Sequence, residues 1–234
     1  MTSPPRKQQR LPRRCFTEAH HLFYCWNKID MKKYKLYVRD QKTRKLIEVD
    51  DIPGIKINVN PEFEGVNSQV IVGAKNRFFS CSITLTKNNI VDIAQSRWKI
   101  RRLDALCEVG SNLLVSEDFS CHSVVMDIQE GRTIRIGKDC QFSSGIKLRT
   151  GDGHPLFDGD DVINRGKDIS IGDHVWIGQD VTVLKGSIVQ NGSVVGIGSI
   201  VTKPFDKENV VIVGNPARVV KENIHWTRDL LSRI

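Results

Sequence analysis

The stretch IGDHVWIGQDVTVLKGSIVQNGSVVGIGSIV, residues 171–201, places an aliphatic residue at every sixth position. A period of six fits neither an α-helix, with 3.6 residues per turn, nor a simple strand, whose period is two. It is typical of a parallel β-helix, in which the first residue of each hexad points inward and glycine or asparagine turns the corner. The aliphatic positions are Ile171, Ile177, Val183, Val189, Val195 and Val201, and small or β-branched residues follow four positions later at Val175, Val181, Ser187, Ser193 and Ser199.

The same period of six appears earlier, at Ile136, Phe142 and Leu148, and is then interrupted. The spacing from Leu148 to Ile171 is not a multiple of six, so the two runs of hexads are out of phase. Residues 150–168 contain five aspartates, four glycines and one proline, so we predict an inserted, solvent-exposed loop. Loops on a rigid scaffold often carry function.

The rest of the chain divides by composition into a tail, an N-terminal segment, a β-helix and a C-terminal helix. Residues 1–14 hold five basic residues, three prolines and no acid, which predicts a disordered basic tail. Residues 15–65 are predicted to form a basic segment with short strands, either a short sheet or a first irregular coil. The β-helix is expected over 66–222, although no register is evident before 136. Aliphatic residues near helical spacing predict a short helix over 223–234.

Positive charge is concentrated at the N-terminus. The chain of 234 residues has 35 Lys and Arg against 27 Asp and Glu, a net charge of +8. Residues 1–47 hold 13 of the basic and 3 of the acidic side chains, so the remainder has 22 basic and 24 acidic ones. This split disfavours a dispersed nucleic-acid-binding surface, and no nucleic acid partner is expected. The basic end is instead expected to attract a polyanionic glycan or an anionic membrane surface.

Six scattered cysteines without a CxxC pair favour reduced thiols, with Cys140 as the clearest core residue. The N-terminus has Glu18 and two histidines where a signal peptide needs an apolar run, and no stretch has the roughly 18–20 apolar residues of a membrane span. We therefore predict a cytoplasmic protein. A secreted protein with disulfides is the alternative.

Three segments resemble the hexapeptide-repeat acyltransferases: Ile171-Gly-Asp-His-Val-Trp-Ile-Gly178, Gly196-Ile-Gly-Ser-Ile-Val-Thr-Lys203 and Gly214-Asn-Pro-Ala-Arg-Val219. Within that family the chain is most similar to sugar O-acetyltransferases, including those that modify capsular sialic acid polysaccharides. The resemblance implies an all-β, left-handed parallel β-helix. It also implies acetyl-CoA as acyl donor and a homotrimer with active sites between subunits; no metal is expected, on the histidine spacing given below.

His154 lies in the inserted loop between Gly153 and Pro155. In the resembling enzymes a histidine of this loop is the general base. Imidazole suits that role because it titrates near neutral pH and a sugar hydroxyl is a poor nucleophile. The alternative is a surface histidine beside a proline. Asp152 either orients the imidazole or forms an Asx turn, and the turn is favoured. His174 occupies a hexad corner and is expected to be exposed and non-catalytic.

The resemblance also implies a set of residues for the coenzyme. Trp176 ends a hexad and should face outward, where it lines a groove or, alternatively, a trimer contact. Phosphates need cations, and glycines allow the backbone to approach the pantetheine arm closely. By motif position the assigned residues are Trp176, Gly178, Gln179, Gly196, Ile197, Thr202, Lys203, Arg218 and Lys221.

The predicted function is an acetyl-CoA-dependent O-acetyltransferase acting on a sugar hydroxyl of a bacterial surface or capsular polysaccharide. An acidic, sialic-acid-type acceptor is favoured, because Arg149-Thr-Gly-Asp-Gly-His154 most resembles capsule-modifying enzymes. Alternatives are an amino-sugar N-acetyltransferase, a non-catalytic scaffold and a zinc hydratase on the same coil. A zinc hydratase needs three histidines that converge on one metal ion, two of them close together in the sequence. His122, His154 and His174 include no such closely spaced pair.

Overall fold

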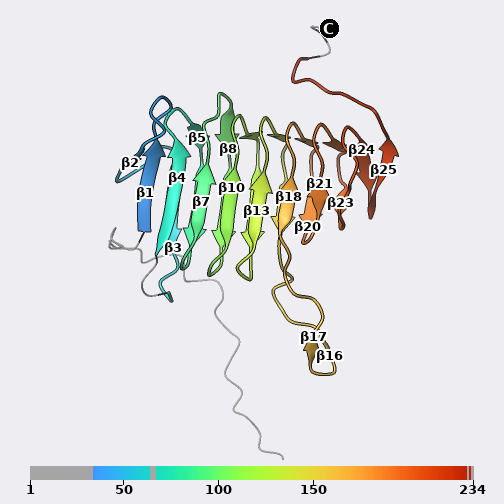
Figure 1. Ribbon diagram of the computed structural model, residues 1–234, viewed down its shortest axis with the longest axis horizontal. Coiled ribbons are helices and arrows are strands. Elements are labelled where there is room, and N and C mark those ends of the chain that lie inside the picture. Colours follow the sequence, from blue (N-terminus) through green and yellow to red (C-terminus); the bar gives the residue numbers. More distant parts are fainter. Residues whose placement is uncertain (1–33, 64–66, 231, 233–234) are drawn as a thin grey trace, which may run out of the picture. The chain divides into compact units, whose positions relative to one another are not determined.

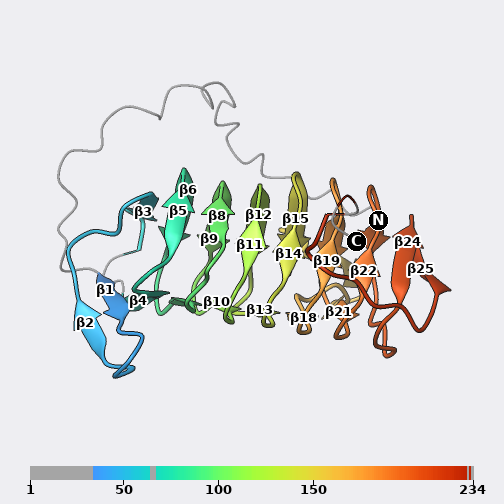
Figure 2. The same ribbon diagram turned by 90° about the horizontal axis from the view of Figure 1, so that it is seen from above.

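The computed structural model describes residues 34–63, 67–230 and 232. The predicted tail, residues 1–14, and the N-terminal segment up to residue 33 lie outside the described residues. Three parallel sheets form the sides of a left-handed β-helix of about seven turns, with no α-helix in the described part. The strands of each sheet follow one another along the long axis, from β1 to β25 (Figures 1 and 2). The all-β, parallel β-helix prediction is confirmed.

Each coil passes through sheet 1, sheet 2 and sheet 3 in turn. Sheet 1 contains β1 (Tyr34–Arg39), β4 (Ser68–Gly73), β7 (Ile90–Ile93), β10 (Asn112–Val115), β13 (Thr133–Ile136), β18 (Ile169–Ile171) and β21 (Ile188–Val189), with β2 (Leu46–Glu48) antiparallel at its edge. Sheet 2 contains β5 (Arg77–Phe79), β8 (Lys99–Arg101), β11 (Ser120–Cys121), β14 (Gln141–Phe142), β19 (Trp176–Ile177), β22 (Val194–Val195) and β24 (Val211–Gly214), closed by the antiparallel β25 (Ala217–Lys221). Sheet 3 contains β3 (Ile55–Val59), β6 (Cys81–Leu85), β9 (Leu103–Cys107), β12 (Val124–Ile128), β15 (Ile146–Arg149), β20 (Thr182–Leu184) and β23 (Ile200–Val201).

The core fills the space between the three sheets. All six aliphatic hexad positions from Ile171 to Val201 are at most 2% exposed. Four free cysteines are also buried, and burial raises the pKa of Cys107, Cys121 and Cys140 to about 12. Cys140 is therefore a core residue, as predicted. Cys15 and Cys25 lie outside the described residues.

Coil length differs between the two halves of the β-helix. Ser170 pairs with Ile188 in the next coil, so this coil is three hexads long. Asn112 instead pairs with Ile90 in one direction and Thr133 in the other, so both of these coils are longer than three hexads and differ from each other in length. The sheet 3 strands β6, β9 and β12 have five residues each, against three in β20. Because these coils differ in length, the phase shifts from coil to coil and the hexad pattern is lost there. Of the strands predicted within 34–59, β1 and β3 pair in parallel with β4 and β6, whereas β2 folds back antiparallel on β1, so the segment is the first irregular coil.

Two kinds of residue make the corners. Asp180, His174 and several glycines, among them Gly192 and Gly198, adopt positive φ and turn the chain. Gly178 does not have positive φ; a Cβ there would lie 2.8 Å from the backbone nitrogen of Ile197 in the next coil. Glycine thus serves the turn at some corners and close coil stacking at others.

The C-terminal helix predicted for 223–234 is wrong for residues 223–230, which form an extended segment without helix. The prediction counted aliphatic residues, yet Leu230 is 60% exposed. Trp226 and Arg228 make the contacts that hold this segment, as described below. No helix in the described residues is long and apolar enough to cross a membrane.

Candidate active site

The inserted loop leaves the β-helix after β15 and returns at β18, at the corner where sheet 3 meets sheet 1. Its tip is a small antiparallel hairpin of β16 (Phe157–Asp158) and β17 (Asp161–Val162), which projects away from the coils (Figure 1). Its base is closed by two backbone donors: the amide of Lys167 binds the Thr150 carbonyl at 2.9 Å, and that of Gly166 binds the Glu130 carboxylate at 2.8 Å. The predicted loop at 150–168 therefore projects from a fixed base.

His154 is exposed on this loop and lines a hollow of about 250 Å³. Glu108 and Glu130 from the two preceding corners line the same hollow, together with Asn164 and Arg165 from the returning limb of the loop. In the described part of the chain, neither imidazole nitrogen has a hydrogen-bond partner within the protein. The ring is thus available to a molecule that enters the hollow.

A hydrogen-bond network holds the backbone of His154. The side-chain amide of Asn164 donates to the His154 carbonyl and to the Asp152 carboxylate, both at 2.9 Å. Its oxygen accepts from the amide of Leu156 at 2.7 Å. Asn164 therefore joins the two limbs of the loop around the histidine.

Lys185 ties this network to the next coil. Its ammonium donates to the Asp152 carboxylate and to the Asn164 carbonyl, each at 2.5 Å. The ammonium of Lys185, and next the amide of Asn164, hold the pKa of the Asp152 carboxyl below its usual value. Asp152 neither orients the imidazole nor forms the expected Asx turn; it anchors the loop to Lys185.

Five of the residues assigned to the coenzyme stack in one column at the corner between sheets 2 and 3. The amide of Gly178 binds the Val195 carbonyl, and the amide of Gly198 binds the carbonyl of Gln179 at 2.8 Å. Ile197, 70% exposed, lies on the next coil beside Gly178. Arg218 on β25 pairs with Val213 at the following level. The column contains Gly178, Gln179, Gly196, Ile197 and Arg218.

The other predicted residues lie elsewhere. Thr202 and Lys203 follow β23 and are exposed at the sheet 3–sheet 1 corner, the corner that also carries the His154 loop. Lys221 ends β25. Within one chain, His154 and the Gly178–Ile197 column therefore occupy different corners of the coil.

Trp176 faces outward, as predicted, and has a partner that the sequence did not indicate. It is 38% exposed, and its ring centroid lies 5.9 Å from that of Trp226 in the C-terminal segment. Trp226 also stacks on His174, which is half-buried by this contact rather than fully exposed as expected. The only hint in the sequence is Trp226 itself, a single tryptophan in a polar C-terminal stretch, and it does not say which residues Trp226 contacts.

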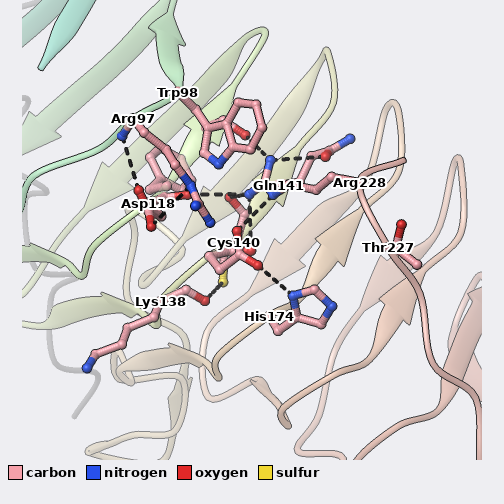
Figure 3. Close-up of polar contacts among 12 residues, drawn as sticks. Arg97, Trp98, Asp118, Lys138, Cys140, Gln141, His174, Thr227 and Arg228 are labelled. Carbon is pink, nitrogen blue, oxygen red and sulfur yellow. Dashed lines mark hydrogen bonds and ion pairs between the residues drawn. The ribbon is translucent and has the colours of Figure 1, made fainter. Parts of the chain in front are cut away.

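Arg228 fastens the same segment to sheet 2. Its guanidinium donates to the Asp139 carboxylate at 2.8 Å, to Ser120 at 2.9 Å and to Gln141 at 3.1 Å. It also lies 4.8 Å from the ring centroid of Trp98. Figure 3 shows Arg228 between Trp98 and Gln141, above the strands of sheet 2. Residues 223–230 are therefore called the C-terminal strap.

Comparisons with known proteins agree with this geometry. The chain is 37% identical over 171 residues to a polysialic acid O-acetyltransferase of Neisseria meningitidis, covering 71% of this chain and 78% of that protein. It is 36% identical over 127 residues to a protein of the same name from Escherichia coli O1:K1 / APEC, covering 53% of this chain and 41% of that protein. No model of a known protein family matches the chain.

Two solved structures have the same fold over most of the chain. The polySia-specific acetyltransferase NeuO superposes with a TM-score of 0.66 and 26% identity, covering 87% of this chain and 93% of that one. The polysialic acid O-acetyltransferase OatWY superposes with a TM-score of 0.63 and 31% identity, covering 76% and 89%. The likeness therefore extends through the β-helix.

Proposed function

This chain belongs to the family of the polysialic acid O-acetyltransferases, and from that membership we propose that it transfers the acetyl group of acetyl-CoA to a hydroxyl group of a sialic acid polymer. The observation that carries the proposal is the 37% identity to the polysialic acid O-acetyltransferase of Neisseria meningitidis, in an alignment that covers 78% of that protein. A capsular or other bacterial surface polysaccharide is the proposed acceptor. The predicted cytoplasmic location and an anionic membrane contact through the N-terminus remain proposals from the sequence.

His154 is the proposed general base. Its ring is exposed in a hollow, while Asn164, Asp152 and Lys185 hold its backbone, so a substrate hydroxyl meets an accessible imidazole carried on a held backbone. The ring takes the proton of the sugar hydroxyl as the hydroxyl oxygen attacks the thioester carbonyl. The carbon–sulfur bond then breaks, and the imidazolium returns the proton to the leaving sulfur. The products are the sugar acetate and CoA thiol.

The charges around this hollow favour one orientation of an acidic sugar. Glu108 and Glu130 line the hollow and would repel the carboxylate of the acceptor. Arg165, exposed in the same lining, offers a planar fork that suits a carboxylate. The acceptor carboxylate is therefore proposed to face Arg165, which leaves a ring hydroxyl toward His154.

The donor is proposed to lie along the column of Gly178, Gln179, Gly196, Ile197 and Arg218, beside the indole of Trp176. Arg218 and Lys221, exposed on β25, are the proposed contacts of its phosphates within the same chain. Thr202 and Lys203, at the sheet 3–sheet 1 corner that carries the His154 loop, are proposed to reach the donor from a neighbouring copy. The large exposed face of Ile197 suits the apolar stem of the pantetheine arm.

A homotrimer is proposed because one chain separates the two halves of this site. His154 lies at the sheet 3–sheet 1 corner, and the donor column lies at the sheet 2–sheet 3 corner. A neighbouring copy whose loop reaches across to this column would complete the site. The family resemblance gives the same arrangement.

Direct assay tests the proposal. Purified protein is given acetyl-CoA and, separately, sialic acid oligomers, neutral oligosaccharides and amino sugars. Ester formation on the sialic acid oligomers, with little transfer to the other acceptors, is expected. Preferred amide formation on amino sugars would instead identify an N-acetyltransferase, and no transfer to any acceptor would favour a non-catalytic scaffold.

A further inference from the structure

A second hollow, of about 320 Å³, lies on the outer face of sheet 2 over β5, β8, β11 and β14. Three cationic side chains of the sheet line it, Arg77 from β5 and Lys99 and Arg101 from β8, and Arg228 of the C-terminal strap is a fourth. His122 adds an imidazole at the next coil. No residue of this hollow belongs to the loop of His154 or to the proposed donor column.

The strand register gathers these cations on one surface. Arg77 pairs with Lys99, and Phe79 pairs with Arg101, so their side chains share the outer face of the sheet. The ammonium of Lys99 and the guanidinium of Arg101 lie 5.7 and 6.0 Å from the ring centroid of Phe79. Among the described residues, neither cation forms an ion pair.

A neighbouring hollow at the sheet 1–sheet 2 corner makes a useful contrast. Two of its four cations are paired with carboxylates there: Arg97 with Asp118 at 3.4 Å, and Arg44 with Glu117 at 3.7 Å; Arg77 lines both hollows. None of the described residues that line the sheet 2 hollow is acidic. The sheet 2 hollow therefore keeps uncompensated positive charge on a body that is otherwise near neutral.

Arg228 and Trp98 form a fixed wall of the hollow. The Arg228 side chain is only 14% exposed and is paired with Asp139, so its charge is already satisfied. It holds the Trp98 indole from one side while the indole remains 36% exposed on the other (Figure 3). The hollow thus combines free cations with a flat aromatic surface.

We propose that this hollow binds carboxylates of the polysaccharide acceptor, on a stretch of chain away from the hydroxyl that is acetylated. The inference rests on the proposed function. Lysine and arginine attract carboxylates, and the aromatic faces of Trp98 and Phe79 suit the apolar faces of sugar rings. From Arg77 to His122 the patch crosses two coil spacings of about 4.8 Å, or about 10 Å in all, which accommodates more than one charged group of a polymer.

The test is a double variant, Lys99→Gln with Arg101→Gln, in the full-length chain. A matched control, Lys87→Gln with Arg135→Gln, removes the same charge from exposed positions outside both hollows. Binding of long and short sialic acid oligomers is measured by calorimetry, beside KM for each oligomer and for acetyl-CoA. Thermal unfolding checks that each variant is folded, and Arg77→Gln provides a second, single-site probe.

The expected result is about a tenfold weaker affinity for long oligomers in the Lys99 and Arg101 variant, with binding of a short oligomer, kcat and the KM of acetyl-CoA unchanged. An equal loss in the control would overturn the site, because general charge attraction would then explain it. A raised KM for acetyl-CoA would assign the hollow to donor phosphates instead. Equally tight binding of single-stranded DNA at this hollow would also contradict a glycan site.

The two proposals fail separately. If the wild-type protein acetylates the oligomers but the double variant keeps its affinity for long chains, the binding site is overturned and the proposed acetyl transfer is not. If the wild-type protein binds long chains through Lys99 and Arg101 but does not acetylate them, the binding site is supported and the proposed acetyl transfer is overturned.

Discussion

The imidazole of His174 lies flat on the indole of Trp226, with ring centroids 4.1 Å apart and an interplanar angle of 10°. The Trp226 ring nitrogen donates to the His174 carbonyl at 2.9 Å, while Nε2 of His174 lies 3.0 Å from the Trp226 carbonyl. Nδ1 lies 2.8 Å from the Asp139 carboxylate. Both ring nitrogens thus face acceptors, so the ring satisfies both when it carries two protons. This contact holds the C-terminal strap over the outward face of Trp176.

Trp226→Ala should release the strap. The indole stacks on His174 and contacts Trp176, so its loss should cost about 1.5 kcal/mol and lower Tm by about 3–6 °C. The fluorescence of the remaining tryptophans should shift to longer wavelength as Trp176 becomes more exposed. Thr227→Ala is the control, because its hydroxyl bonds only within the strap, to Asp229. Equal Tm values for the two variants would contradict a structural role for Trp226.

The fold was predictable where the hexad phase is regular. From Ile171 to Val201 each coil is three hexads long, so sequence spacing alone identifies the buried positions. Before residue 136 the coils are longer and unequal in length, and strands such as β9 and β12 have five residues where β20 has three. No single period describes that half, so its register could not be read from the sequence.

The site was predictable only in part. The inserted loop and His154 follow from the broken phase and from local composition. The anchor of the loop does not, because Lys185 meets Asp152 and Asn164 only once the next coil is stacked. The basic hollow of sheet 2 was hidden for a similar reason: Arg77 and Lys99 are neighbours by strand register, not by sequence. Charge summed along the chain cannot show this clustering.

His154→Ala should abolish most acetyl transfer. Loss of a general base lowers kcat by about 10²- to 10⁴-fold, and the exposed ring contributes little to folding, so Tm should not change. Initial rates with acetyl-CoA and sialic acid oligomers measure the effect. His225→Ala, another exposed histidine, is the control and should retain full activity. Equal rates for wild type and His154→Ala would remove His154 from the mechanism.

The Asp152–Lys185 contact predicts how the loop depends on pH. The pKa of Asp152 is lowered in the folded protein, mainly by Lys185. Its contribution is therefore present above the ordinary carboxyl pKa of about 3.9 and is lost as the pH falls through the lowered value. Asp152 therefore stays ionised between about pH 5 and 8. The rate of limited proteolysis within residues 150–168, corrected for the pH dependence of the protease itself, should be slow and constant over that range.

Removal of that contact should loosen the loop at neutral pH. Asp152→Asn should speed cleavage within 150–168 and reduce kcat several-fold, while global unfolding changes little because the side chain is exposed. Asp160→Asn, at the exposed tip of the same loop, supplies the comparison and should behave as wild type. Unchanged cleavage of Asp152→Asn would show that the loop is held by its base alone.

Separate corners for His154 and the donor column predict complementation between subunits. His154→Ala lacks the proposed base, and Ile197→Glu places a negative charge in the proposed donor column at an exposed position. Each variant alone should be nearly inactive. Unfolding and refolding the two together should restore part of the activity, because some sites then combine an intact loop with an intact column. A mixture as inactive as its components would place both halves in one subunit.

Deletion of residues 1–14 tests the basic N-terminus separately from the sheet 2 hollow. The deletion removes five positive charges and no negative ones. If these charges attract the polymer, KM for long sialic acid oligomers should rise at low salt, and the difference from wild type should shrink as salt screens the interaction. Turnover on short oligomers should be spared. When the deletion is combined with Lys99→Gln and Arg101→Gln, losses that add in free energy would show that residues 1–14 and the hollow act independently on long chains. A loss of Tm together with equal losses on short and long acceptors would mean instead that residues 1–14 stabilise the fold.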